Sequence, residues 1–155
     1  MIVFLTKAPA MQFDPDNKIV KLCAQGMDLE GEGKNEEASN IFLQAWEQAS
    51  NHKEKFTAAH YVARHQKSIA DKLAWDEIAL NLALKIKDDS VKGAYSSLYL
   101  NIAKGYEDLQ EFEKATKHYE TALVYVNFLH DDGYGKMIKG GVEHGLERIK
   151  THLKK

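Results

Sequence analysis

Histidine and cysteine are the residue types of this chain best suited to chemistry, and their spacing limits what they can do. The 155-residue sequence has seven histidines, of which His60 and His65 are the closest pair. Because they are five residues apart on a predicted helix, their side chains point in different directions. No adjacent Cys, Asp or Glu completes a zinc-like ligand set. His144 follows Glu143, but it lacks the second histidine at the spacing that a metallopeptidase helix requires. The sequence therefore predicts no metal site.

A nucleophilic thiol and a phosphate loop are the other sites to consider. Cys23 has no evident activating base, so we expect it to be inert packing or part of a groove wall. The stretch 31–34 lacks the earlier glycine and the following Ser or Thr of a Walker loop. The stretch 133–136 fails the same test, and no strand precedes it. We therefore expect no catalytic residue and no cofactor.

The balance of charge argues against nucleic acid as a partner. Lys and Arg total 21 against 23 Asp and Glu, so the formal net charge is -2. Sequence-independent binding to nucleic acid depends on a basic excess that this chain does not have. Its large aromatic residues Phe42, Trp46, Tyr61 and Trp75 fall on apolar helical faces without interleaved basic runs, which favours core packing over base stacking.

The N-terminal segment suggests neither export nor a membrane anchor. The apolar run Met1 to Leu5 is interrupted by Lys7, and it is too short for a signal peptide or a membrane helix. A single cysteine fits a reducing compartment, so we expect a cytoplasmic location. We expect residues 1–13 to be a flexible tail, of which residues 1–10 could also be an over-extended start, and residues 14–155 to form one domain.

Helical periodicity extends through the rest of the chain. The two prolines, Pro9 and Pro15, both precede residue 17, so no proline breaks the body of the protein. We expect Asp14 to cap the first helix with Pro15 in its first turn, and Asn35 to cap the second. Later helices are predicted at 56–70, 75–86, 91–109, 112–126 and 134–153, which gives seven in all.

Small and large residues recur at matched positions in two of the predicted hairpins. The last hairpin has Tyr99, Ile102, Ala103 and Tyr106, then Ala115, Tyr119 and Ala122; the first has Leu22, Gly26 and Leu29, then Ala38, Phe42 and Ala45. This spacing resembles the tetratricopeptide repeat. Ala38 and Ala115 are 77 residues apart, so a degenerate middle unit must lie between them, at Val62, Ile69, Trp75, Ile78 and Leu82.

The resemblance covers roughly residues 17 to 129 and implies an all-α fold. The expected architecture is a right-handed α-solenoid of three antiparallel helical hairpins, closed by a C-terminal capping helix over 134–153. Self-similar proteins of this kind stack their hairpins because one hairpin cannot bury its apolar face alone. An ordinary helical bundle with accidental self-similarity is the alternative.

Tetratricopeptide proteins typically hold extended peptides on a concave surface lined by the first helix of each hairpin. The resemblance therefore implies a non-catalytic scaffold or adaptor that binds a protein or peptide. The matching positions are Cys23 and Met27, and a candidate peptide-binding groove of His60, Arg64, Lys67, Ser97, Leu100, Asn101 and Lys104. Its basic side chains favour an acidic peptide or a free C-terminal carboxylate. The alternative is that these are ordinary solvated residues of helix faces.

Two other functions stay open. Bacterial proteins that look like this one are associated with ribosomal-RNA adenine methyltransferase activity. Such an enzyme needs a parallel sheet, a glycine-rich loop for the methyl donor and a motif such as Asn-Pro-Pro-Tyr. The absence of proline after Pro15 disfavours it. The third possibility is a structural homo-oligomer that meets its own copy through the groove or an uncapped end.

Overall fold

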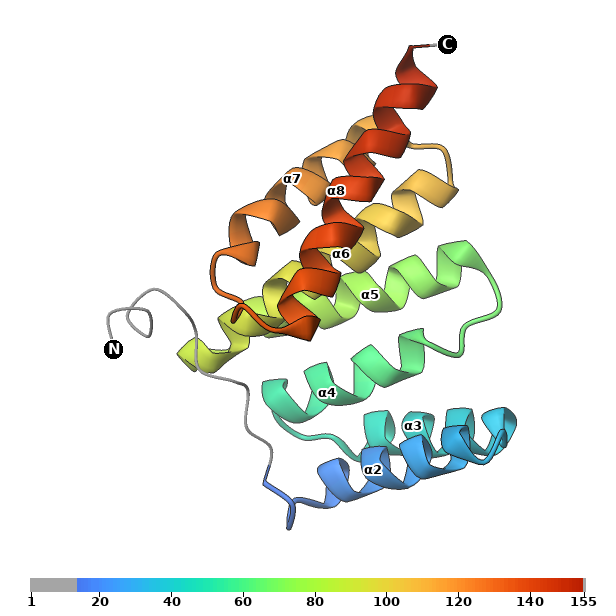
Figure 1. The fold of residues 1–155 in the computed structure, drawn as a ribbon. Coiled ribbons are helices and arrows are strands. Elements are labelled where there is room, and N and C mark those ends of the chain that lie inside the picture. The colour runs from blue at the N-terminus through green and yellow to red at the C-terminus, as the bar shows by residue number, and fades with distance from the viewer. Residues whose placement is uncertain (1–13, 155) are drawn as a thin grey trace. The chain divides into compact units, whose positions relative to one another are not determined.

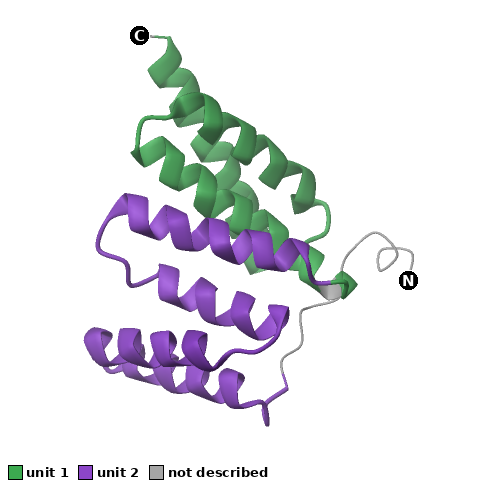
Figure 2. Ribbon diagram, turned by 180° about the vertical axis from the view of Figure 1, so that it is seen from behind, with its two compact units in different colours: residues 1–11, 87–155 green, residues 12–86 purple. Residues whose placement is uncertain are grey.

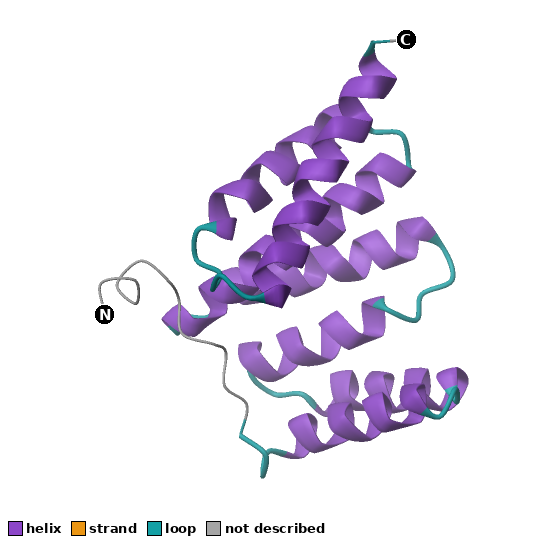
Figure 3. Cartoon of the chain, viewed as in Figure 1, coloured by secondary structure: helices purple, strands orange, loops and turns teal. Residues whose placement is uncertain are grey.

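The computed structural model describes residues 14–154, and this part of the chain is helical (Figure 3). Its elements are α2 (Lys18–Gly31), α3 (Asn35–Gln48), α4 (His52–Ala63), α5 (Ile69–Leu84), the short 3-10 helix η1 (Asp89–Val91), α6 (Lys92–Asp108), α7 (Phe112–Val126) and α8 (Gly133–Leu153), labelled in Figure 1. The described residues contain no strand, which confirms the prediction of an all-α fold with seven α-helices there. The predicted tail, residues 1–13, lies outside the described residues.

The helices form two compact units, shown in different colours in Figure 2. The N-terminal unit holds α2 to α5, and the C-terminal unit holds η1 to α8. In the N-terminal unit α2 and α3 form a hairpin, and α4 packs against both of them and against α5. In the C-terminal unit α6 and α7 form a hairpin, and α8 packs against both. Each unit is thus built on a hairpin with a third helix against it.

The two hairpins have the same turn, 77 residues apart. Gly33 has a φ of 77° between α2 and α3, and Gln110 has a φ of 63° between α6 and α7. In each turn the next residue donates its backbone N–H to a carbonyl five residues earlier, Lys34 to Leu29 and Glu111 to Tyr106, both at 2.9 Å. A left-handed residue after the last helical turn satisfies carbonyls that the helix leaves open. The self-similarity of the sequence therefore extends to the backbone of these turns.

The cores of the two hairpins also repeat. Ala38, Phe42 and Ala45 of α3 have no exposed surface, and neither do their counterparts 77 residues later, which are Ala115, Tyr119 and Ala122 of α7. Gly26 lies under the Phe42 ring, where an added Cβ would come within 2.3 Å of it. Small residues at these sites let the helices approach while the large ring fills the remaining space, as predicted.

Helix ends in the N-terminal half differ from the prediction. Asn17, not Asp14, caps α2, accepting the N–H of Ile19 at 2.8 Å. Asn35 is the first residue of α3 and follows Lys34, which makes no side-chain cap. Asn51 accepts the Glu54 N–H at 2.8 Å and so starts α4 earlier than expected.

The middle pair of helices is shifted most. The helix predicted over 56–70 ends at Ala63, and α5 begins at Ile69 rather than at Trp75. Ser68 caps α5 by accepting the Asp71 N–H at 3.0 Å. A serine cap is a local signal for a helix start, and the prediction from apolar periodicity did not include it. Lys67 consequently lies in the loop between α4 and α5 and not on a helix face.

Candidate functional site

The predicted groove residues of the N-terminal unit are His60, Arg64 and Lys67, and their surroundings differ. His60 lies half-buried on α4, edge-on to Tyr61, and burial lowers its pKa, with smaller contributions from the charges of Arg64 and Lys72. Arg64 follows α4 and forms an ion pair with Glu30 of α2 at 2.6 Å, while its guanidinium lies 5.1 Å from the Tyr61 ring centre. Lys67 is exposed. The positive charge of Arg64 is therefore balanced by the Glu30 carboxylate of the same unit.

The predicted groove residues of the C-terminal unit all lie on α6. The Ser97 hydroxyl donates to the Ala94 carbonyl at 3.0 Å, and Asn101 is half-buried. Leu100 packs against the core of this unit and faces Gly141 of α8. Lys104 forms an ion pair with Asp108 one turn later. Leu100 therefore helps to hold α8, and Lys104, like Arg64, has an acidic neighbour.

Each unit also has an ionic link between its first and third helices, which the sequence analysis missed. In the N-terminal unit Glu30 of α2 meets Arg64 and the His65 Nε2, both at 2.6 Å. In the C-terminal unit Glu107 of α6 accepts two bonds from Arg148 of α8, at 2.8 and 3.0 Å. Glu30 and Glu107 are again 77 residues apart, so comparing polar positions between the two hairpins would have revealed them.

The link in the C-terminal unit includes a buried tyrosine. The Tyr119 hydroxyl donates to Glu107 at 2.6 Å and receives a bond from Arg148 at 3.3 Å. Burial acts to raise the pKa of Glu107, but the hydrogen bonds from Arg148 and Tyr119 outweigh it, so the net shift is downward. Burial and the Glu107 carboxylate raise the pKa of Tyr119. Glu107 therefore stays ionised and the phenol stays protonated at neutral pH, an arrangement that holds three helices together.

Cys23 does not have the surroundings of a reactive thiol. It is buried in the core formed by α2, α3 and α4. Burial raises its pKa to about 11. Because the thiolate is the nucleophilic form, a thiol that stays protonated at neutral pH is suited to packing.

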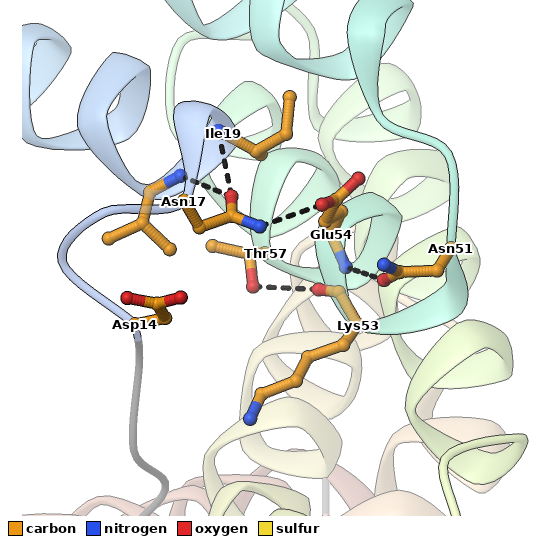
Figure 4. Close-up of a pocket in the computed structure, with 8 residues that line it drawn as sticks. Asp14, Asn17, Ile19, Asn51, Lys53, Glu54 and Thr57 are labelled. Carbon is orange, nitrogen blue, oxygen red and sulfur yellow. Dashed lines mark hydrogen bonds between the residues drawn. The ribbon is translucent and has the colours of Figure 1, made fainter.

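A pocket of about 100 Å³ opens between the N-terminal ends of α2 and α4 (Figure 4). It is lined by Asp14, Asn17, Ile19, Val20, Asn51, Lys53, Glu54 and Thr57. Asp14 is the only one of these residues that the sequence analysis singled out, and there it was expected to be a helix cap. With Asn17 in that role, the Asp14 carboxylate is left at the pocket, on the side facing Thr57 in Figure 4.

A hydrogen-bond network fixes the wall of this pocket. The Asn17 side chain caps α2 with its oxygen and donates from its nitrogen to Glu54 of α4 at 2.8 Å. The other Glu54 oxygen accepts the backbone N–H of Ser50 at 2.9 Å and its hydroxyl at 3.0 Å. The bond from Asn17, followed by those from Ser50, lowers the pKa of Glu54. The ionised carboxylate thus joins the starts of the two helices.

Residues 14–154 lack two other kinds of site. No group of three or more His, Cys, Asp or Glu side chains in this range is placed to hold a metal ion. None of its helices is long and apolar enough to cross a membrane.

Comparison of the chain with protein-family models, with curated proteins and with solved structures finds no match.

Proposed function

We propose that this chain is a tetratricopeptide-like α-solenoid that acts as a non-catalytic scaffold or adaptor in the cytoplasm. Its function is to bind an extended segment of a partner protein along the face shared by α2 and α4. The observation that carries the proposal is the pocket between these two helices, because they are the first helices of successive hairpins. In the family that the sequence resembles, such helices line the peptide-binding surface.

The repeated turns and cores support the solenoid part of the proposal. Two hairpins with left-handed residues at Gly33 and Gln110 and the same buried small and large positions are what stacked repeats require. Within each unit the third helix covers both helices of the hairpin, as the next repeat in a stack would.

The chemistry of the described residues supports a binding role over catalysis. The Cys23 thiol is buried and protonated at neutral pH, and the Glu30 and Glu107 carboxylates are engaged by arginine. The parallel sheet that a methyltransferase uses to hold its methyl donor has no counterpart in residues 14–154, which contain no strand. We expect calorimetry to detect no binding of S-adenosylmethionine, and micromolar affinity would contradict the non-catalytic proposal.

The proposed partner segment carries an acidic residue or a free C-terminal carboxylate near the end of α4. Arg64, with 44% of its side chain exposed, and Lys67 present positive charge there. The exposed Lys104, together with Ser97 and Asn101, forms a similar polar set on α6 of the other unit. Arginine and lysine recognise carboxylates through charge-assisted hydrogen bonds.

Selection from a phage-displayed library of random dodecapeptides on the immobilised full chain tests this function. We expect a family of peptides that bind the wild type. Synthetic peptides from that family should bind the Arg64→Ala, Lys104→Ala double variant more weakly. Lys139→Ala, which removes an equally exposed lysine from α8, should bind as the wild type does.

Stability serves as the internal control of this experiment. Lys104 forms an exposed ion pair, so its loss should cost less than about 1 kcal/mol of unfolding free energy, whereas loss of the bond from Arg64 to the half-buried Glu30 should cost about 1 to 3 kcal/mol. If no peptide family emerges, the peptide-binding function is wrong. If peptides bind the folded double variant as tightly as the wild type, the assignment of Arg64 and Lys104 to peptide binding is wrong.

A further inference from the structure

We infer that the pocket between α2 and α4 holds one aliphatic side chain of the partner peptide, and that Asp14 pairs with a lysine or arginine next to that side chain. This inference rests on the proposed peptide-binding function and specifies its ligand. It concerns the N-terminal end of the α2–α4 face, whereas Arg64 and Lys67 lie beyond the C-terminal end of α4.

The size of the pocket selects a single side chain. A volume of about 100 Å³ suits one small apolar group, since an engineered cavity of about 150 Å³ holds a benzene molecule. Sites for cofactors and drug-sized molecules are larger, about 300 to 1,000 Å³. Polar residues make up most of the lining, and its apolar residues are the half-buried Val20 and the fully buried Ile19 of α2. A branched aliphatic group fits this volume and can contact Val20.

Asp14 contributes a carboxylate to the pocket, in addition to the charges of Lys53 and Glu54. Its carboxylate accepts the backbone N–H of Asp16 at 2.9 Å, and it forms no ion pair with another residue in the described range 14–154. The Glu54 carboxylate also lies at the pocket, but its oxygens already accept bonds from Asn17 and Ser50. Lys53 contributes a cation to the lining, and its side chain extends away from Glu54 in Figure 4. Asp14 is therefore the carboxylate left to meet a cation of the ligand.

The pocket is also formed before any ligand binds. Asn17 and Asn51 cap the two helices, and Glu54 joins Asn17 to Ser50 across the gap between α2 and α4. The Thr57 hydroxyl donates to the Lys53 carbonyl at 2.8 Å, which satisfies this hydroxyl within its own helix. A wall fixed in this way does not have to be ordered on binding, so more of the contact energy appears as affinity.

The peptides selected from the library test the inference by their sequences and by their response to variants. We expect Leu, Ile or Val within two positions of Lys or Arg in the enriched family. Fluorescence anisotropy should show about 3- to 5-fold weaker binding to Asp14→Asn, because one exposed ion pair is lost, and a larger loss for Val20→Phe, which fills the pocket. Asp16→Asn, the same change two residues away and outside the pocket lining, should stay within about twofold of the wild type.

Folding is separated from binding by the choice of variants. Asp14 is exposed and precedes α2, and an asparagine there can still accept the Asp16 N–H, so Asp14→Asn tests the charge without disturbing the helix. Methyl resonances of Ile19 and Val20 should also shift when a selected peptide is added to the wild-type chain. If Val20→Phe fails to fold, these two measurements still decide the question.

The possible results distinguish the two proposals. A library that yields no peptide family overturns the peptide-binding function, and the ligand assignment with it. A family that binds but lacks the aliphatic and basic pair, that binds Asp14→Asn as tightly as the wild type, or that leaves the Ile19 and Val20 methyl resonances unmoved overturns only the assignment of this pocket.

Discussion

At the scale of single residues, two glycines of α8, Gly140 and Gly145, differ in what surrounds them. An added Cβ at Gly145 would lie 2.3 Å from the Tyr119 ring, which is fully buried and bonded to Glu107. An added Cβ at Gly140 would meet nothing within 4 Å. The helix propensity gained by replacing glycine with alanine is the same at both positions, about 1 kcal/mol. Only the packing around each glycine should therefore make the two alanine substitutions differ in their effect on stability.

We predict that Gly145→Ala lowers the free energy of unfolding by about 1 to 3 kcal/mol, since Tyr119 cannot move without breaking its hydrogen bond. Gly140→Ala should raise it by about 0.5 to 1 kcal/mol, since it only favours the helix. Urea unfolding of the two variants and the wild type measures both. A stabilised Gly145→Ala variant would show that α8 does not pack on α7 as closely as described.

The two hairpin turns allow a second prediction at this scale. Left-handed backbone is costly for residues with a side chain, by about 1 to 2 kcal/mol, but glycine adopts it readily. Gln110 has this conformation at 63°, and Gly33 has it at 77°. Gln110→Gly should therefore stabilise the protein by about 0.5 to 1 kcal/mol, and Gly33→Gln should destabilise it by about the same amount. Thermal unfolding checks both, and a fall in melting temperature for Gln110→Gly would contradict the turn geometry.

The sequence predicted the packing residues better than the polar ones. Buried positions such as Ala38 and Phe42 follow the helical spacing of apolar residues, because they all face the core. That spacing can be recognised in the sequence. Glu30 and Glu107 look like ordinary surface residues, because the partners that engage them come from a helix 34 or 41 residues later in the chain. Asp14 and Glu54 line the pocket because α2 and α4 begin after the caps Asn17 and Asn51, and these helix starts were not predicted from the sequence.

At the scale of helices, the Glu107 link makes the attachment of α8 dependent on pH. The pKa of Glu107 is lowered in the folded chain, so the carboxylate stabilises the fold above the pKa of the unfolded state. That contribution is lost as the pH falls through the lower, folded-state pKa. The acidic limb of the stability curve is therefore where the link can be measured.

We predict that Glu107→Gln costs about 1 to 3 kcal/mol at pH 7, as expected for a hydrogen-bonded charge, and progressively less as the pH falls below about 4. Glu120→Gln, an exposed change on α7, should cost less than about 0.5 kcal/mol at every pH. Urea unfolding at a series of pH values provides the comparison. A difference between wild type and Glu107→Gln that does not change with pH would show that the carboxylate is not a stabilising charge.

Helix positions were predictable where the periodicity was strong and the ends were marked by turn residues. The helices at 112–126 and 134–153 were placed to within one residue of α7 and α8. The middle pair was misplaced because α4 is buried on several sides, with Phe56, Thr57, Ala58 and Ala59 all buried in succession. A helix covered all round has no single apolar stripe, so its periodicity does not show where it ends.

At the scale of the whole molecule, the sequence predicted one domain over residues 14–155, and the structure divides into two compact units within it. Two compact units of one chain can unfold either together or separately. In a stack of repeats each element contacts only its neighbours, so a local defect need not spread through the chain. In a single cooperative domain, a defect anywhere lowers the stability everywhere.

Matched substitutions in the two hairpins test which description applies. Ala38 and Ala115 are both fully buried and 77 residues apart, so Ala38→Phe and Ala115→Phe introduce the same overpacking in different units. Each should cost about 1 to 3 kcal/mol, because the helices of its hairpin are forced apart. Hydrogen exchange followed by mass spectrometry should show faster exchange in peptides from α2, α3 and α4 for Ala38→Phe, and in peptides from α6, α7 and α8 for Ala115→Phe. Equal acceleration throughout both units in either variant would show that residues 14–154 unfold as one cooperative domain.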